Sequence, residues 1–223
     1  MKLFKKNLKE IKGDASFRFF FRKKNKLKNS IIVYAKKEKK KNLLNYDSIN
    51  KLLIENKILA PKLYNENYKN NFIEIEDFGD VTLFNLLKNE KKNKIKIFKK
   101  IINLLISIQG IKKNKSKNFK NKNYIIPIYN NKKLFEEAKL FCDWYVPKVI
   151  SPKKRSFLNK NLKVEIKFLL SKMNQKNNCF VHRDFHVSNL MMFKKKIAII
   201  DTQDAVVGNR AYDLASLIDD VRF

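Results

Sequence analysis

The first third of the chain combines short β-rich runs with one helical pattern. Aromatic and β-branched residues dominate segments 17–22 and 30–35, which flank the polar stretch KKNKLKN, and this arrangement predicts a hairpin. A second strand pair is predicted at 61–66 and 72–77, joined by NYKNN. Between the two pairs a helix is predicted from apolar residues three and four positions apart, among them Leu43, Leu44, Ile49, Leu52, Leu53 and Ile54. The pattern indicates a small mixed lobe that ends near Gly79.

The remainder of the chain shows mostly helical periodicity. Apolar spacing predicts helices at 83–87, 95–108, 134–145 and 157–173, and a last helix that begins near Ala211. The Lys- and Asn-rich segment 112–123 is interpreted as a loop. Apolar runs too brief for helices predict strands at 179–181, 190–193 and 197–200. We therefore expect an α+β fold with a small β-rich lobe at 1–79 and a larger, mostly helical lobe at 80–223.

The segment CFVHRDFHVSNLMMF carries the strongest chemical signal. It places His182, Asp184 and Asn189 in the pattern HRDxxxxN after a predicted strand, and IAIIDTQDA then brings Asp201 to the end of another strand. Phosphoryl transfer needs a carboxylate to position an acceptor hydroxyl and oxygen ligands to hold Mg²⁺. We interpret Asp184 as the catalytic base and His182 as the residue that orients its loop. Asn189 and Asp201 are the expected metal ligands, whereas a plain turn is the alternative for Asp184 and Asn189.

Longer stretches add a resemblance to a known family. HRDFHVSNLMM followed by IIDTQDAVVGNRAYDLASLIDD resembles the catalytic half of the aminoglycoside-phosphotransferase family, and within it the bacterial N-acetylmuramate/N-acetylglucosamine anomeric kinases. GDASFRFFFR at 13–22 is similar to the nucleotide loop of that group, FIEIEDFGD at 72–80 to its hinge, and IPIYNNKKLFEEAKLFCDWYV at 126–146 to its substrate-lobe helix. The resemblance covers nearly the whole chain. It implies a protein-kinase-like two-lobed fold, ATP and Mg²⁺ as cofactors, and a small hydroxyl compound, first an amino sugar, as acceptor.

The same resemblance implies a nucleotide site in the first lobe. A single glycine in GDAS is a weaker signal than GxGxxG and by itself indicates an ordinary turn. Backbone N–H groups of this loop are expected to cover the phosphates, and backbone groups of the hinge are expected to hold adenine. The residues are Gly13, Asp14, Ala15 and Ser16 in the loop and Glu74, Ile75, Glu76 and Asp77 in the hinge.

The expected phosphate-binding cation is less well marked. The strand at 30–35 lacks the lysine of a VAIK motif, so Lys36 is the candidate phosphate ligand. Its helix partner is either Glu55 or no residue. Arg183 is expected to pair with a carboxylate of the scaffold, and Asp213, at the start of a helix, to brace the catalytic loop.

The acceptor side has several candidate residues. His186, which follows the predicted base by two positions, either contacts phosphate or substrate or is a structural imidazole. Gln203 and Asp204 are expected to face the metal or the sugar. Glu137 and Trp144 fall on one face of the predicted helix, together with Phe141, and are expected to bind substrate. Trp144 either stacks on a sugar ring or packs in the core.

The charge of the chain is strongly positive. It has 51 Lys+Arg against 21 Asp+Glu, a formal net charge of +30, which can attract nucleic acid through phosphate contacts. Only six of these residues are arginines, however, and base readout favours arginine. The joint abundance of Lys, Asn, Ile and Phe instead indicates the coding bias of an AT-rich genome, so nucleic acid is disfavoured as a partner.

Cysteine content and hydropathy restrict the remaining classes. Cys142 and Cys179 are far apart, and with only two histidines in the chain they do not predict a zinc site. The basic N-terminus lacks the apolar core of a signal peptide, and no apolar run reaches 18 residues. We expect a cytoplasmic protein with reduced thiols and no membrane span. Members of the family continue beyond the segment that LIDDVRF resembles, so the resemblance implies further helices after Phe223. The sequence gives no indication of the oligomeric state.

Three functions stay open. The first is a kinase for the anomeric hydroxyl of N-acetylmuramate or N-acetylglucosamine in cell-wall recycling. The second is a kinase for another small alcohol, such as choline, homoserine, an aminoglycoside or a lipopolysaccharide sugar. The third is a catalytically weak module that binds nucleotide or nucleic acid through its lysine surface.

Overall fold

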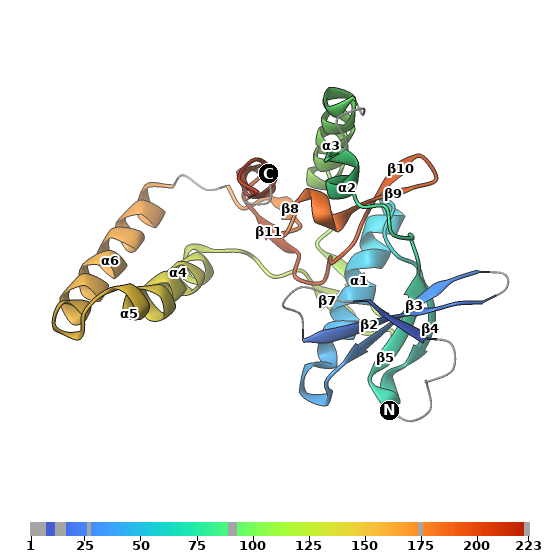
Figure 1. Ribbon diagram of the computed structural model, residues 1–223, viewed down its shortest axis with the longest axis horizontal. Coiled ribbons are helices and arrows are strands. Elements are labelled where there is room, and N and C mark those ends of the chain that lie inside the picture. Colours follow the sequence, from blue (N-terminus) through green and yellow to red (C-terminus); the bar gives the residue numbers. More distant parts are fainter. Residues whose placement is uncertain (1–7, 12–16, 26–27, 89–92, 174–175, 221–223) are drawn as a thin grey trace.

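A five-stranded antiparallel sheet forms the N-terminal part of the molecule (Figure 1). The structure is a computed structural model that describes residues 8–11, 17–25, 28–88, 93–173 and 176–220. The strands run in the order β1-β2-β3-β5-β4 and are β1 (Leu8–Ile11), β2 (Arg18–Lys23), β3 (Ser30–Ala35), β4 (Leu63–Asn67) and β5 (Phe72–Glu76). Both predicted strand pairs are confirmed, whereas β1 was not predicted. The expected loop residues Gly13, Asp14, Ala15 and Ser16 lie outside the described residues.

The predicted helix between the strand pairs is α1 (Lys41–Glu55), and it joins two cores. Leu43 and Tyr46 near its start pack against the sheet with Val33 and Ile73. Residues of its second half, among them Ile49 and Leu52, belong instead to the core of the C-terminal part. Because one rigid helix contributes to both cores, it ties the sheet to the rest of the molecule. Short 3₁₀ turns, Lys37–Lys39 and Tyr68–Asn70, lie before α1 and between β4 and β5.

The C-terminal part combines helices with small two-stranded sheets (Figure 1). Antiparallel pairing joins β9 to β10 and β8 to β11. A 3₁₀ turn, Val187–Asn189, leads directly into β9. The elements that build the main core are α2 (Leu83–Leu87), α3 (Lys94–Gln109), β8 (Cys179–Val181), β9 (Leu190–Phe193), β10 (Lys196–Ile199), β11 (Val206–Gly208) and α7 (Ala211–Ile218). The helices predicted at 83–87 and 95–108 and the three predicted strands are confirmed within one residue at each end, the helix predicted at 157–173 begins five residues earlier, at Pro152, and β11 was missed.

The interpretation of segment 112–123 as a loop was wrong. It contributes the hairpin of β6 (Lys115–Lys117) and β7 (Asn123–Ile125), which packs on α1. Alternation places Ser116 inward and its lysine neighbours outward, so the strand carries no hydrophobic signature. Asn118 builds the turn, because its side-chain oxygen accepts from the backbone N–H of Lys120 at 2.9 Å.

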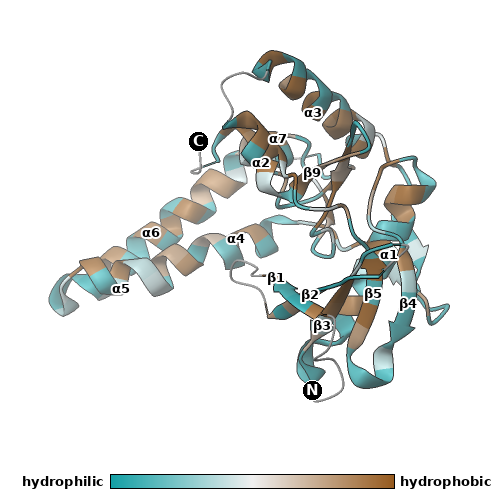
Figure 2. Ribbon diagram, turned by 45° about the vertical axis from the view of Figure 1, so that its right-hand side comes forward, coloured by the Kyte–Doolittle hydropathy of each residue, from teal (hydrophilic) through white to brown (hydrophobic). Residues whose placement is uncertain are grey.

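A helical arm projects from the body of the molecule (Figures 1 and 2). It consists of α4 (Asn131–Leu140), a π-helical turn (Phe141–Tyr145), α5 (Val146–Val149) and α6 (Pro152–Lys172). The predicted single helix at 134–145 was therefore wrong beyond Leu140. Pro147 supplies a reason, because it lacks the N–H that would bond the carbonyl of Asp143 in an α-helix.

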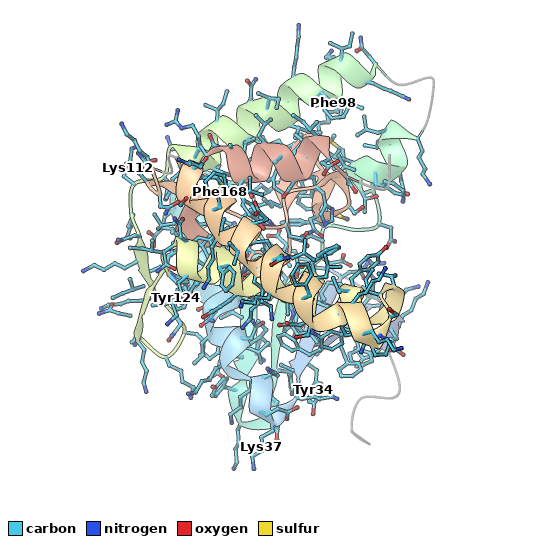
Figure 3. The ribbon with its side chains drawn as sticks, turned by 90° about the vertical axis from the view of Figure 1, so that its left-hand side faces the viewer. Tyr34, Lys37, Phe98, Lys112, Tyr124 and Phe168 are labelled. Carbon is cyan, nitrogen blue, oxygen red and sulfur yellow. The ribbon has the colours of Figure 1, made fainter. Side chains whose placement is uncertain are left out.

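The arm exposes apolar side chains. No residue of α4 or α6 is buried, and along both helices apolar and polar segments intermingle (Figure 2). Phe168 on α6, labelled in Figure 3, is 53% exposed, and Trp144 in the π-helical turn is 70% exposed. The alternative that Trp144 packs in the core was therefore wrong.

Other expectations from the sequence are tested by the same structure. Both cysteines are buried and unpaired. None of the described helices has the length and the apolar character needed to cross a membrane. A β-rich first part before a mostly helical second part is confirmed, whereas the boundary between 79 and 80 stays a prediction.

Candidate active site

A cavity of about 420 Å³ lies between the five-stranded sheet and the β9–β10 hairpin. The wall that the sheet contributes is apolar and includes Phe20, Ile31 and Ile75. The wall that the C-terminal part contributes, called the floor from here on, is polar and brings together the predicted residues Asp184, His186, Asn189 and Asp201. The hinge segment from Ile75 to Gly79 lines one edge. An apolar wall suits a flat aromatic ring, and a floor of carboxylate and amide oxygens suits phosphates with a cation.

His182 lies beneath this floor and is fully buried. Its ring Nε2 is 3.0 Å from the carbonyl oxygen of Ile200, and its Nδ1 is 3.3 Å from the backbone N–H of Asp184. Because the carbonyl only accepts and the N–H only donates, the ring carries its hydrogen on Nε2. His182 therefore connects the loop of Asp184 to the strand end that precedes Asp201.

Asp184 and Asn189 contact each other directly. The amide nitrogen of Asn189 donates to the Asp184 carboxylate Oδ2 at 2.9 Å and to its backbone carbonyl at 3.0 Å. Nε2 of His186 lies 3.0 Å from the other carboxylate oxygen. The hydrogen bond from His186 is the largest cause that lowers the pKa of Asp184 to about 2, and partial burial opposes it. The carboxylate is therefore ionised throughout the physiological range.

Asp201 follows β10 in a left-handed backbone conformation, with φ of 63°. Aspartate tolerates this region better than most residues, and such backbone is concentrated at functional sites. Asp201 lies close to Asn189, which precedes β9, because the N–H of its neighbour Ile200 donates to the carbonyl of Asn189 at 3.0 Å. Gln203 and Asp204 follow, and the Gln203 amide donates to the Asp204 carboxylate at 2.7 Å.

The oxygens on the floor fit a magnesium ion. Asn189 uses its amide nitrogen toward Asp184, which leaves its amide oxygen as the end that can coordinate a cation. The carboxylate of Asp201 provides a second hard oxygen. The described residues contain no cluster of three or more His, Cys, Asp or Glu side chains that could hold a metal. Two protein ligands are few for zinc, but Mg²⁺ commonly takes one or two carboxylates and completes its shell with water and phosphate oxygens.

Asp213 braces the loop, as the sequence predicted. Its buried carboxylate accepts from the backbone N–H of His182 at 2.7 Å and of Arg183 at 3.0 Å. Burial raises its pKa, and the two backbone hydrogen bonds oppose that rise. The second bond matters because Arg183 has φ of 77°, an unfavourable conformation for a long side chain.

Arg183 and Glu137 form a scaffold pair outside the cavity. A guanidinium nitrogen of Arg183 donates to Glu137 Oε1 at 2.6 Å, and Tyr129 donates its hydroxyl to Oε2. The Arg183 guanidinium also lies 5.0 Å from the Tyr129 ring centre. The expected pairing of Arg183 with a carboxylate is confirmed. Both carboxylate oxygens of Glu137 have protein partners, and this residue does not line the cavity.

Other candidates lie away from the cavity. Lys36 is exposed after the end of β3, and its expected partner Glu55 instead pairs with Lys113 at 2.6 Å. Glu74 accepts from Ser30 at 2.5 Å and from Lys23 at 3.1 Å, and does not line the cavity, unlike Ile75, Glu76 and Asp77. Alternation accounts for the contrast with Ile75 alone, because neighbouring residues of a strand point to opposite faces; Glu76 lies at the end of β5, where the chain passes into the hinge that lines the cavity edge.

Two arginines of β2 were missed by the sequence analysis. Arg18 contacts Asp201, with its Nη2 2.5 Å from Oδ1, and Arg22 donates to Asp77 at 2.6 Å and to Asp80 at 2.7 Å. A signal existed: arginines are rare in this lysine-rich chain, and these two lie four positions apart, hence on one face of a strand.

Comparisons with known proteins agree with this geometry. A model of the phosphotransferase enzyme family (APH) matches residues 7–223. The chain is similar to an N-acetylmuramate/N-acetylglucosamine kinase of Neisseria meningitidis, with 25% identity over 211 residues, 93% of this chain and 60% of that protein. The chain spans about 60% of the length of the curated relatives it matches.

Solved structures show the same fold. A gentamicin complex of APH(2″)-IIa has a TM-score of 0.67 and 15% identity, covering 97% of this chain and 71% of that chain. A streptomycin–ATP–APH(2″)-IIa ternary complex has a TM-score of 0.62 and 14% identity, covering 95% of this chain and 71% of that chain. The α+β, protein-kinase-like fold expected from the sequence is therefore confirmed.

Proposed function

The chain belongs to the phosphotransferase enzyme family, and we propose that it transfers the γ-phosphoryl group of ATP to a hydroxyl group of a small molecule. The observation that supports this most is the convergence of Asp184, Asn189 and Asp201 on one cavity floor beneath an apolar wall. A plain turn would give Asp184 and Asn189 no reason to share that floor with Asp201, which is reached from another strand.

In this mechanism Asp184 positions the acceptor. Its ionised carboxylate accepts a hydrogen bond from the acceptor hydroxyl, aligns the oxygen with the γ-phosphorus and takes the proton as the new bond forms. A pKa of about 2 makes it a weak base, so orientation is its larger contribution. His182 and Asp213 hold its loop from below.

The cation and nucleotide take the remaining groups. Asn189 and Asp201 would hold Mg²⁺, which when bound neutralises charge on the β- and γ-phosphates. Adenine would lie against the apolar wall, with backbone groups of Ile75, Glu76 and Asp77 along its edge. In this scheme residues 1–79 bind the nucleotide, and residues 80–223 carry the catalytic loop and part of the acceptor site.

For the acceptor we favour an N-acetylated amino sugar, phosphorylated at its anomeric hydroxyl. The Neisseria relative is named as an N-acetylmuramate/N-acetylglucosamine kinase, which supports this choice. His186, which lines the cavity, and Gln203 and Asp204, which follow Asp201 in the chain but do not line it, are the candidate sugar contacts. Trp144 is exposed enough to stack on a sugar ring.

The test is direct observation of the product. Protein, Mg-ATP and either N-acetylmuramate or N-acetylglucosamine are incubated, and ³¹P NMR is used to look for an anomeric sugar phosphate that appears with ADP. The same measurement with choline, homoserine and an aminoglycoside separates other acceptors. If ATP were consumed only with one of these other alcohols, the amino sugar would be rejected as the acceptor. If no acceptor were phosphorylated and the protein did not bind ATP, the kinase function would be rejected.

A further inference from the structure

We propose that Arg18, on β2, is the cation that binds the nucleotide phosphates from the N-terminal sheet. This inference rests on the proposed function and extends it. Kinases of this kind of fold require a positive charge from the small lobe at the phosphates. The sequence suggested Lys36, but the structure leaves that side chain exposed after the end of β3, and it is Arg18 that contacts Asp201.

Arg18 contacts a residue of the cavity floor from the sheet, although its own side chain is buried just behind the cavity lining. Its Nη2 lies 2.5 Å from Oδ1 of Asp201, a residue 183 positions away in the chain, and its Nη1 donates to Gln203. Among the described residues, Asp201 forms no ion pair with a lysine. Arg18 is therefore the positive charge that the fold places beside the carboxylate proposed to hold Mg²⁺.

Aromatic rings hold the guanidinium in this position. Its carbon Cζ lies 5.7, 5.5 and 5.9 Å from the ring centres of Phe17, Phe20 and Tyr46. Arg18 is only 6% exposed. A guanidinium keeps its charge in such surroundings and stacks on aromatic faces, whereas a buried lysine readily loses its proton. The surroundings thus favour arginine over the usual lysine at this point.

Charge balance explains why the partner becomes a phosphate. In the structure one carboxylate of Asp201 neutralises the buried guanidinium. When Asp201 turns its charge to a magnesium ion, Arg18 gives up this carboxylate, and an anion that takes its place restores the charge balance around the buried guanidinium. A phosphate oxygen bound to that same ion lies within reach, and the planar N–H fork of arginine matches phosphate geometry.

Arg22 shows that not every arginine of β2 serves this purpose. It points to the same face of the strand but is held by the hinge, where it donates to Asp77 at 2.6 and 3.0 Å and to the carbonyl of Gly79 at 3.1 Å. Its cation therefore clamps the hinge, where adenine is proposed to lie. Arg18 instead contacts Asp201, one of the proposed metal ligands.

Isothermal titration with Mg-ATP and with adenosine separates a phosphate contact from a purely structural ion pair. For Arg18→Gln we expect Mg-ATP to bind about 10- to 100-fold more weakly, the effect of one charge-assisted hydrogen bond or two, with adenosine affinity unchanged within about twofold. Lys36→Gln is the matched control, and it should leave both affinities within about twofold. Arg18→Lys, which keeps the charge and is expected to fold, should fall between the wild type and Arg18→Gln.

Three outcomes would overturn the inference. Equal losses for ATP and adenosine in both Arg18 variants would make the residue a structural support only. A loss of ATP affinity in Lys36→Gln but not in Arg18→Lys or Arg18→Gln would return the role to Lys36. If the wild-type chain bound neither ATP nor adenosine, the proposed function itself would fail, an outcome seen before any variant is made and so distinct from the other two.

Discussion

At the scale of single residues, the spacing HRDxxxxN gains a physical meaning. A five-residue separation brings the amide of Asn189 back onto both the carboxylate and the carbonyl of Asp184 through one 3₁₀ turn. The amide thereby restrains the base and keeps its own oxygen for a cation. Asp184 and Asn189 therefore act as a unit, so the effects of their substitutions should not be additive.

Removal of the Asp184 charge is the first prediction. Asp184→Asn should lower kcat by about 10²- to 10⁴-fold with Mg-ATP still bound, because orientation and proton acceptance are lost while the nucleotide contacts remain. Asp201→Ala should instead remove the Mg²⁺ dependence of nucleotide binding. Steady-state rates and titrations with and without Mg²⁺ measure both effects. Full turnover in both variants would refute the assigned roles.

The pH dependence of Asp184 is the second prediction. Its folded pKa, about 2, lies below the ordinary value, so ionisation stabilises the folded protein. That stability is present above the unfolded pKa of about 3.9 and is lost as the pH falls through the folded value. No acid limb in kcat from Asp184 is expected between about pH 5 and pH 8. In His186→Ala the main stabilising hydrogen bond is absent, so the carboxylate pKa should rise, as ¹³C NMR can measure; an unchanged pKa would contradict this cause.

At the scale of elements, α7 supports a loop that it follows in the sequence by about thirty residues. Its first turn carries Asp213, which accepts two backbone N–H groups of the segment after β8. Its position at the start of α7 predicted this support of the catalytic loop, and the two hydrogen bonds confirm it. The loop residue Arg183 keeps its left-handed conformation because its N–H is held there.

Removal of this support is the third prediction. Asp213→Ala leaves two buried N–H groups without an acceptor and should lower the free energy of unfolding by about 1–3 kcal/mol for each group, discounted where water enters. Asp213→Asn retains one acceptor oxygen and should cost less. Urea denaturation of both variants measures the difference. If Asp213→Ala unfolded at the wild-type midpoint, the bracing role would be wrong.

At the scale of the whole molecule, α1 and the Arg18–Asp201 pair join the sheet to the C-terminal part across the cavity. The chain carries a net charge of +30, because its 51 Lys+Arg residues far outnumber its 21 Asp+Glu residues. Self-repulsion at such a charge opposes the compact state. Stability should therefore depend on ionic strength.

The fourth prediction follows from that charge. Raising NaCl from about 0.02 M to about 0.3 M shortens the screening length from roughly 20 Å to roughly 6 Å and weakens the repulsion. The Tm should rise by about 2–4 °C, which corresponds to roughly 1 kcal/mol at this chain length. Sucrose at matched osmolality is the control for an effect of excluded solute. A fall of Tm with salt would mean that ion pairs such as Arg22–Asp77 outweigh the repulsion.

Much of the fold could be predicted from the sequence because it depends on neighbours along the chain. The β-branched and aromatic run of β3 and the apolar spacing of α1 and α3 report local backbone preference and a buried face. Asp184 and Asn189 were predicted together because one short turn determines their distance. The hairpin of β6 and β7 was missed, since alternating polar residues on a surface hairpin carry no hydrophobic pattern.

The sequence by itself determined the order of the strongly patterned elements, the family resemblance and the acidic and amide groups of the catalytic loop, because these follow from short-range spacing. Only the tertiary structure decided which cation meets Asp201, that Glu55 pairs with Lys113, and that Glu137 belongs to the scaffold. The reason is that partners distant in the chain are selected by strand register and by the face on which each side chain emerges. One residue of alternation separates a side chain in the cavity from one on the opposite face of the sheet.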